Sequence, residues 1–294
     1  MVATPAVARD LKVATWNLDW LTLRPDGDQI LPENVHPKTQ ADRQRLRAYA
    51  LALDADVVAF QEVDGPEAAA TVFPPDRYRL LFTADDVVQR VGFAVKRELQ
   101  VQQNPDLAAL DVLPDARFRL RSGADITVRT PGATLRFLAV HLKTGCHRDP
   151  LASARRDCAL LRAQSVPLDG WIAERRRENT PFVVLGDFNR EMDGFSSNGS
   201  RSNGPRSNGP RSNEADDLFA SMSAAAPLLR ATAGQGSPCW SGTSFIDHIM
   251  AGGAARGWMD PQTLRVLRYR EDDPAERDHL SDHCPVSVRF RLPD

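Results

Sequence analysis

The 294-residue sequence has no apolar run that approaches the ~20 residues needed to cross a bilayer, so we expect no membrane span. Its start, Met1 to Lys12, lacks the apolar core of a secretory signal, which by itself favours the cytoplasm. The formal net charge is only −2, so the chain as a whole does not attract a polyanion. A nucleic-acid partner would need a local basic patch. The candidates are Arg155, Arg156, Arg162, Arg175, Arg176 and Arg177, although a solvated helix face is the preferred interpretation of these residues.

Cysteine is scarce, and no Cys-x-x-Cys spacing argues for zinc. Cys146 and Cys158 flank a short loop, and Cys239 and Cys284 lie near late polar segments. The even number indicates disulfides, Cys146–Cys158 first, although buried reduced thiols fit equally well. A Cys146–Cys158 bond would stabilise the fold by about 3 kcal/mol and would imply export, because cytosolic thiols stay reduced.

Composition is that of an ordinary globular chain, with 42% hydrophobic and 26% charged residues. Polar motifs recur from one end to the other, so we expect one domain over 1–294, with its core over 11–292, and a monomer. A tandem repeat of Ser-Asn-Gly-x-Arg starts at Ser197. It predicts a mobile, dispensable insertion over 196–213, because it has nothing to bury. Arg201, Arg206 and Arg211 could touch a polyanion, but a neutral insertion is the simpler interpretation.

The hydrophobic pattern alternates between strands and helices. Helices are predicted over 39–53, 66–71 and 153–177, and further strands over 78–83, 91–96, 117–121, 126–130 and 135–141. The residues of the last helix expected to face a core are Leu160, Leu161, Val166, Leu168, Trp171 and Ile172.

The most informative segment begins with four apolar residues, 182–185, which predict a buried strand that Gly186 breaks. Asp187 and Asn189 follow two positions apart, so strand alternation would point both side chains the same way. A carboxylate beside a carboxamide suits a phosphate, because the acid can hold a metal or accept a proton and the amide can donate to an oxyanion. A simple turn is the alternative.

Other apolar strands also end in polar residues. Asn17 and Asp19 follow one strand, Glu62 ends a second and His141 ends a third. The late members of this set are Asp247, Asp282 and His283. Each alone fits a solvated acid, a core histidine or a loop. Together they occupy equivalent places, and strand ends can share one sheet edge, where sites are built.

Five acids would then meet in one cleft: Asp19, Glu62, Asp187, Asp247 and Asp282. Like charges held close together cannot all ionise without compensation, so a divalent cation is expected. Carboxylates without cysteine ligands favour Mg²⁺ or Mn²⁺ over zinc.

This set resembles the endonuclease/exonuclease/phosphatase superfamily, which includes deoxyribonuclease I. The matching elements, in the family's order, are Thr15-Trp16-Asn17-Leu18-Asp19, Gln61-Glu62, His141-Leu142-Lys143, Gly186-Asp187-Phe188-Asn189, Ile246-Asp247-His248 and Ser281-Asp282-His283-Cys284-Pro285-Val286. The resemblance implies an α/β fold, a four-layer α/β/β/α sandwich of two packed, mainly antiparallel or mixed sheets flanked by helices, with the site at one sheet edge.

Roles follow from the chemistry of each side chain. Glu62, with Asp19 or Asp282, would hold a metal that polarises a phosphoryl oxygen. Either Asp187 or His283 would deprotonate the attacking water, and the two remain alternatives. Asp247 would orient His283.

The remaining candidates would contact the phosphate. His141, Asn17 and Asn189 would hydrogen-bond its non-bridging oxygens. Lys143 and Arg90 are weaker phosphate candidates. His248 should point to the opposite face from Asp247 and is interpreted as structural.

Three functions compete. The favoured one is a metal-dependent phosphodiester hydrolase of nuclease type that acts on nucleic acid, either as an endonuclease or as an exonuclease. The second is a phosphoesterase for a lipid or small phosphate, such as a sphingomyelin or inositol phosphate. The third, a non-catalytic binding module, is weakest, because every chemically demanding position is filled.

Overall fold

The computed structural model describes residues 10–116, 118–193, 217–271, 273, 276 and 279–293. The insertion predicted over 196–213 lies outside the described residues, so its mobility stays a prediction. No helix in the described ranges is both long and apolar enough to cross a bilayer.

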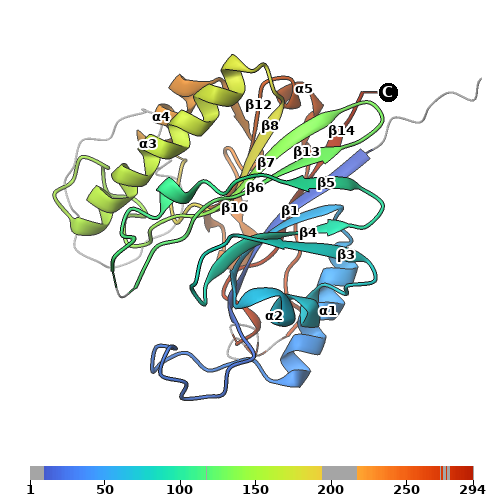
Figure 1. The fold of residues 1–294 in the computed structure, drawn as a ribbon, viewed down its shortest axis with the longest axis vertical. Helices are drawn as coiled ribbons and strands as arrows, with labels where there is room; N and C mark the ends of the chain where they lie inside the picture. The colour runs from blue at the N-terminus through green and yellow to red at the C-terminus, as the bar shows by residue number, and fades with distance from the viewer. Residues whose placement is uncertain are drawn as a thin grey trace, which may run out of the picture.

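Two six-stranded sheets stack face to face (Figure 1). The strands of the first sheet, in spatial order, are β13 (Met259–Val266), β14 (Val286–Arg291), β1 (Asp10–Leu21), β2 (Val57–Val63), β4 (Arg90–Lys96) and β3 (Tyr78–Phe82). Those of the second are β5 (Gln100–Gln103), β6 (Ala124–Arg129), β7 (Thr134–His141), β8 (Phe182–Asp187), β12 (Asp247–Gly252) and β9 (Leu228–Arg230). Each sheet contains one parallel pair, β1 with β2 and β7 with β8, among antiparallel neighbours.

Helices cover the outer faces (Figure 1). Helices α1 (Gln40–Leu53) and α2 (Gly65–Val72) pack on the first sheet, and α3 (Arg156–Arg177) and α4 (Asp217–Ala225) pack on the second. The short elements are α5 (Ala255–Trp258), η1 (Ala108–Leu110), η2 (Pro238–Trp240) and the two-residue strands β10 (Gly236–Ser237) and β11 (Thr243–Ser244). One core cluster fills the space between the sheets and one lies under each helical layer, so the predicted four-layer sandwich is confirmed.

Local sequence explains where α1 begins and ends. The Thr39 side chain accepts from the Asp42 backbone N–H, and the Asp42 carboxylate accepts from the Thr39 N–H at 2.9 Å, which forms a capping box. The helix ends at Asp54, which adopts a left-handed conformation. Leu46, Tyr49 and Leu53 lie on its buried face, as the 3–4 spacing predicts.

Three local predictions are wrong. Residues 118–121 form no strand, although cationic and apolar residues alternate here. They lie in a loop in which the Arg119 side chain and the Leu120 backbone N–H donate to the Asp111 carboxylate. Val166 is 70% exposed, because the helix face toward the sheet passes through Leu161, Leu168 and Ile172 instead.

The third concerns Gly186, which lies inside β8 rather than ending it. It adopts φ +143°, and a Cβ there would collide with the Val140 carbonyl oxygen. Glycine therefore permits the close approach of β7 and β8.

Candidate active site

Strand register puts three candidate residues in one row. Within the second sheet, His141 on β7 is the register partner of Asp187 on β8, and Asp187 is the partner of Asp247 on β12. Directly paired residues on neighbouring strands point to the same face, so the sheet itself assembles an Asp-Asp-His row.

The first sheet brings two more residues to the same place. The parallel strands β1 and β2 end together, with Asn17 on one and Glu62 on the other. The Asn17 Nδ2 atom donates to Glu62 Oε1 at 2.9 Å and to Asp187 Oδ2 at 3.1 Å. This amide links the ends of the two sheets.

The backbone around the site is unusual. Asp19, Trp20, Glu62 and Asn189 all have positive φ, between 43° and 62°. Such conformations cost of order 1–3 kcal/mol each for non-glycine residues and cluster at functional sites. Strand alternation does not place Asn189 beside Asp187, as the sequence predicted, because β8 ends at Asp187. Asn189 reaches Asp187 through a turn, in which its backbone N–H donates to Asp187 Oδ1 at 2.7 Å and its Nδ2 donates to Oδ2 at 3.3 Å.

His283 completes the buried cluster. Its Nδ1 lies 2.8 Å from Asp247 Oδ2, and its Nε2 lies 3.7 Å from Asp187 Oδ2. With Nδ1–H donating to the carboxylate, Nε2 is left facing Asp187. The side chains of Asp187, Asp247 and His283 are at most 9% exposed, and we call them the dry side of the site.

Burial and neighbouring charge shift the pKa values of the dry side. Burial, together with the charge of Asp247, raises the pKa of Asp187 to about 7, although His283 and hydrogen bonds from Asn189 and Asn17 oppose this. Burial alone would lower the pKa of His283, but the Asp247 and Asp187 carboxylates raise it well above its usual value. His141, whose Nε2 lies 3.6 Å from Asp187, has a pKa well below its usual value because it is buried.

Three acids form a more accessible group, which we call the open side: Asp19, Glu62 and Asp282. Their side chains are 34%, 13% and 67% exposed. A second amide, Gln89, donates its Nε2–H to Glu62 Oε2, and the Trp20 N–H donates to the same oxygen at 3.3 Å. The structure therefore brings every predicted catalytic and metal residue to one end of the two sheets.

The sequence matches the Endonuclease/Exonuclease/phosphatase family over residues 14–283. The chain belongs to this family. No curated protein matches it.

Solved structures share the fold of this endonuclease/exonuclease/phosphatase protein. The 3′-5′ exonuclease NExo from Neisseria meningitidis superposes with a TM-score of 0.59 at 17% identity, covering 96% of this chain and 100% of its own. Truncated TDP2 from Caenorhabditis elegans gives 0.57 at 14% identity, covering 96% and 98%. TDP2 from D. rerio, complexed with a single-strand DNA product, gives 0.57 at 17% identity, covering 96% and 98%.

Two cations of this family member were missed by sequence reasoning. Lys38 is 3% exposed, and its ammonium contacts the Asp19 carbonyl oxygen and lies 3.4 Å from Asp19 Oδ2. Burial lowers the pKa of Lys38, whereas the charges of Asp19, Glu62 and Asp282 act to raise it, so the ammonium faces the whole open side. No periodicity marks it, because it stands in a loop before the α1 cap.

The second missed cation is Arg121. Its guanidinium interacts electrostatically with Glu62 and Asp187, yet it makes no ion pair within 4 Å among the described residues, and its Nε is buried without a partner. It lies in the segment that was mistaken for a strand, so nothing in the pattern pointed it toward the site.

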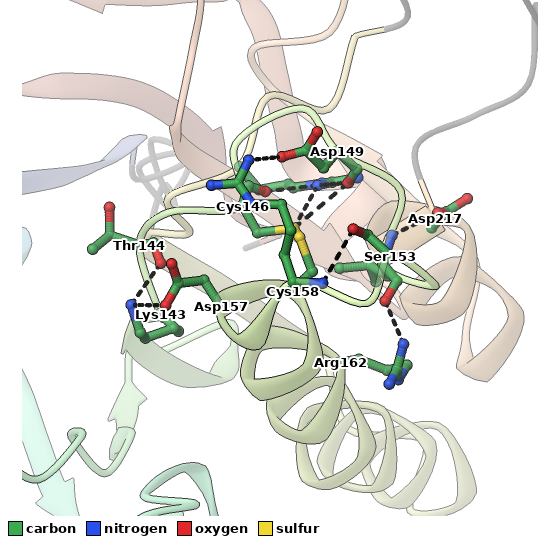
Figure 2. Close-up of a disulfide and its surroundings, with 12 residues drawn as sticks. Lys143, Thr144, Cys146, Asp149, Ser153, Asp157, Cys158, Arg162 and Asp217 are labelled. Atoms are coloured by element: carbon green, nitrogen blue, oxygen red, sulfur yellow. Dashed lines mark hydrogen bonds and ion pairs between the residues drawn. A yellow bond between two sulfur atoms is a disulfide. The ribbon is translucent and has the colours of Figure 1, made fainter. Parts of the chain in front are cut away.

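The weaker candidates have other partners. Lys143 Nζ is 2.8 Å from Asp157 Oδ1, beside the Cys146–Cys158 disulfide that joins the loop after β7 to the first turn of α3 (Figure 2). Arg90 donates to the Val87 carbonyl. His248 points away from Asp247, between Thr232 Oγ1 at 2.7 Å and the Arg190 carbonyl at 2.9 Å, as the structural interpretation requires.

The donor set fits a divalent cation in two respects. Among the described residues, one group of ligand atoms gathers within 4.8 Å, that of Asp187, Asp247 and His283. In addition, Asp247 Oδ1 is buried without a hydrogen-bond donor, which a cation would satisfy. The open-side acids, predicted as the metal ligands, offer hard oxygen donors with access to water, which suits Mg²⁺ or Mn²⁺. Which of the two groups holds the ion stays a prediction.

Proposed function

We propose that this protein is a divalent-metal-dependent phosphodiester hydrolase that acts on nucleic acid. Membership of the family supports a phosphoesterase or nuclease. The observation that carries the choice of substrate is a groove of about 830 Å³ beside the site, which combines apolar and cationic side chains.

The groove is bounded by residues that also serve the site. Trp20 and Gln89, both bonded to Glu62, line it. Its cations are Arg119, Arg121, Lys143 and Arg156, against the two acids Asp86 and Asp157. A strip of cations interleaved with apolar and aromatic surface suits a nucleic-acid strand, because phosphates pair with the cations and bases stack on the rings.

Two solved relatives give independent support. The D. rerio TDP2 structure contains a single-strand DNA product, and a Neisseria NExo structure described as a 3′ phosphatase is bound to a product DNA hairpin. Both of these structures contain DNA, which supports nucleic acid as the proposed substrate.

The open side is the proposed place of the metal. Glu62, with Asp19 and Asp282, would hold a Mg²⁺ or Mn²⁺ ion, which when bound polarises a phosphoryl oxygen and stabilises the leaving group. Lys38 keeps the Asp19 turn in place and offsets part of the negative charge.

The dry side assigns the proton transfer. Asp247 and Asp187 raise the pKa of His283, which favours its protonated form and makes it the poorer base. Asp187, with a pKa of about 7, is suited to accept a proton from the attacking water. We therefore infer that Asp187 is the general base and that the His283 imidazolium stabilises charge on the phosphoryl oxygens.

Neutral donors contribute next to these groups. His141 is neutral, and its Nε2, 3.5 Å from Glu62 and 3.6 Å from Asp187, is placed to donate to a non-bridging oxygen. Asn17 Nδ2 donates to Asp187 and Glu62, and Asn189 Nδ2 donates to Asp187 and the Leu142 carbonyl. Both amides therefore orient the proposed base. The sequence predicted a different role for them, hydrogen bonding to the non-bridging phosphate oxygens.

One observation favours a lipid or small-molecule phosphoester as the second candidate. Ile30 and Phe118, 57% and 73% exposed, lie on the groove and offer apolar surface that an acyl chain could cover.

The disulfides bear on where in or outside the cell the protein works. All four cysteines form disulfides, Cys146–Cys158 and Cys239–Cys284, so we propose that the protein works outside the cytosol.

Turnover on a panel of substrates tests the assignment. The panel is single-stranded DNA, plasmid DNA, abasic DNA, RNA, sphingomyelin, an inositol phosphate and an aryl phosphodiester, each with Mg²⁺, Mn²⁺ or excess chelator. The Arg121→Met variant should lose about 10-fold more on the polymers than on the aryl diester, because only a polymer fills the groove. Arg79→Met, a cation outside the groove, is the matched control. Preference for sphingomyelin, or full turnover in chelator, would refute the proposal.

A further inference from the structure

A small hairpin contacts the dry side through His283. Residues 236–244, with β10, η2 and β11, form this 236–244 hairpin. Cys239 on the hairpin is bonded to Cys284, which follows His283 directly. The bond joins segments 45 residues apart in the sequence.

The hairpin also holds the two residues before Cys284. The Trp240 indole Nε1–H donates to the Asp282 carbonyl at 2.8 Å. Its ring lies edge-on to the His283 imidazole, with the ring centres 5.2 Å apart and an interplanar angle of 80°. Three consecutive residues of the loop before β14, Asp282, His283 and Cys284, are therefore each attached to the hairpin.

The far side of the loop is held by the core. Ser281 Oγ accepts from the His283 N–H at 3.0 Å and donates to the Asn17 carbonyl, and Tyr269 donates to the His283 carbonyl at 2.8 Å. These bonds fix the backbone of His283. Its imidazole contacts Asp247 through Nδ1, faces Asp187 at 3.7 Å through Nε2, and lies against the Trp240 ring.

Apart from the buried Ser237 and the packing of Cys239 on the core under α1 and α2, little among the described residues anchors the hairpin. Its two strands pair at only two positions, and most of its residues are exposed or half-buried. An isolated two-stranded hairpin is marginally stable in water. The disulfide is thus the strong link that keeps Trp240 on the imidazole.

We propose that the Cys239–Cys284 disulfide and Trp240 are positioning residues for His283, so that opening this one bond lowers turnover while the fold survives. The inference rests on the proposed function. Catalytic geometry is sensitive to such support, because a displacement of about 1 Å can cost about 100-fold in rate.

The second disulfide provides a contrast. Cys146 and Cys158 are both fully buried, whereas Cys239 is half-buried, so we expect a reagent to reach the Cys239–Cys284 bond first. A dithiol such as dithiothreitol would attack one sulfur of Cys239–Cys284, and its second thiol would resolve the mixed disulfide. The reagent leaves as a cyclic disulfide, and the protein gains two electrons and two protons as two thiols.

The test compares the double variant Cys239→Ser/Cys284→Ser with Cys146→Ser/Cys158→Ser, on the full chain with an aryl phosphodiester and Mg²⁺, below the melting temperature of both. We expect kcat to fall about 10- to 100-fold in the first with KM nearly unchanged, and to stay near wild type in the second. Trp240→Ala should match the first variant and add nothing to it. Trp240→Phe, which keeps a ring on the imidazole, should restore most of the rate.

Wild-type kcat in the folded Cys239→Ser/Cys284→Ser variant would overturn the proposal, as would an equal loss in the control pair. Equal impairment of Trp240→Phe and Trp240→Ala would overturn the role of the ring.

A second readout does not depend on activity. The nuclear Overhauser contact between the Trp240 indole and the His283 ring should vanish on selective reduction. If the wild type cleaves no phosphodiester, the proposed function fails, and this contact alone decides the positioning claim. Its persistence after reduction would refute that claim.

Discussion

The dry side and the open side of the site hold similar numbers of acids but treat them differently. Asp187 and Asp247 are 2% and 3% exposed and are fixed by hydrogen bonds, whereas Asp282 is 67% exposed. In the dry group, burial and the charge of Asp247 raise the pKa of Asp187 to about 7, which suits proton transfer. In the open group water can reach the carboxylates, which suits an ion that keeps part of its hydration shell. We therefore propose that the five acids divide between these two tasks, with the most buried pair, Asp187 and Asp247, in proton transfer.

The largest effect should come from the dry side. Asp187→Asn keeps the size of the side chain but removes the proposed base, so kcat should fall about 10³-fold, within the range of general-base catalysis. The variant should fold, because it removes a buried charge. Single-turnover kinetics at saturating Mg²⁺ provide the measurement. A loss below about 10-fold would move the role of base to His283.

The open side should respond to metal instead. Glu62→Gln removes one charge from the proposed ligand set, and we expect turnover at fixed Mg²⁺ to fall at least the roughly 100-fold that mutations around metal ligands cost. A higher Mg²⁺ concentration should restore part of the turnover lost in Glu62→Gln, whereas it should restore none of the turnover lost in Asp187→Asn. Titration calorimetry with Mn²⁺ should show weaker binding in Glu62→Gln. Unchanged Mn²⁺ affinity in this variant, combined with lost affinity in Asp187→Asn, would place the ion on the dry side.

Much of the candidate site can be predicted from the sequence, because the residues that end apolar strands can be recognised. The row formed by His141, Asp187 and Asp247 follows from strand register, and apolar runs mark each of those strands. The loops are different. Lys38 and Arg121 reach the site from segments without periodicity, and their positions depend on tertiary contacts that no local pattern encodes. The partner of Cys239 was likewise open, because pairing depends on distance in the fold.

A third prediction concerns His248, which backs the dry side. Burial lowers its pKa to about 3, whereas an unfolded histidine titrates near 6.5. Above about pH 6.5 both states are neutral. As pH falls from 6.5 toward 3, the unfolded chain takes up a proton that the folded chain refuses, so the free energy of unfolding decreases. From pH 7 to pH 5 this amounts to about 2 kcal/mol.

Urea unfolding of His248→Gln at the two pH values tests this. Glutamine can donate to the Arg190 carbonyl in place of His248 Nε2 but cannot titrate. The variant should lose about 2 kcal/mol less than wild type between pH 7 and pH 5. Identical losses would mean that the imidazole can take up a proton in the folded state and that this side is wetter than the structure shows.

The smallest effect should arise from Lys38, the cation among the open-side acids. Removing its charge in Lys38→Met makes the group more negative, and one unit charge at an effective dielectric constant of about 20 is worth on the order of 1–2 kcal/mol near the surface. Mn²⁺ should therefore bind about 10-fold more tightly to Lys38→Met, with Lys38→Arg as the charge-retaining control. We expect no effect on the dry side, so Asp187→Asn should lower kcat by the same factor in the wild type and in Lys38→Met. Weaker Mn²⁺ binding would mean that Lys38 acts mainly by holding the Asp19 turn, whose carbonyl it contacts, and that the open side depends on backbone shape more than on net charge.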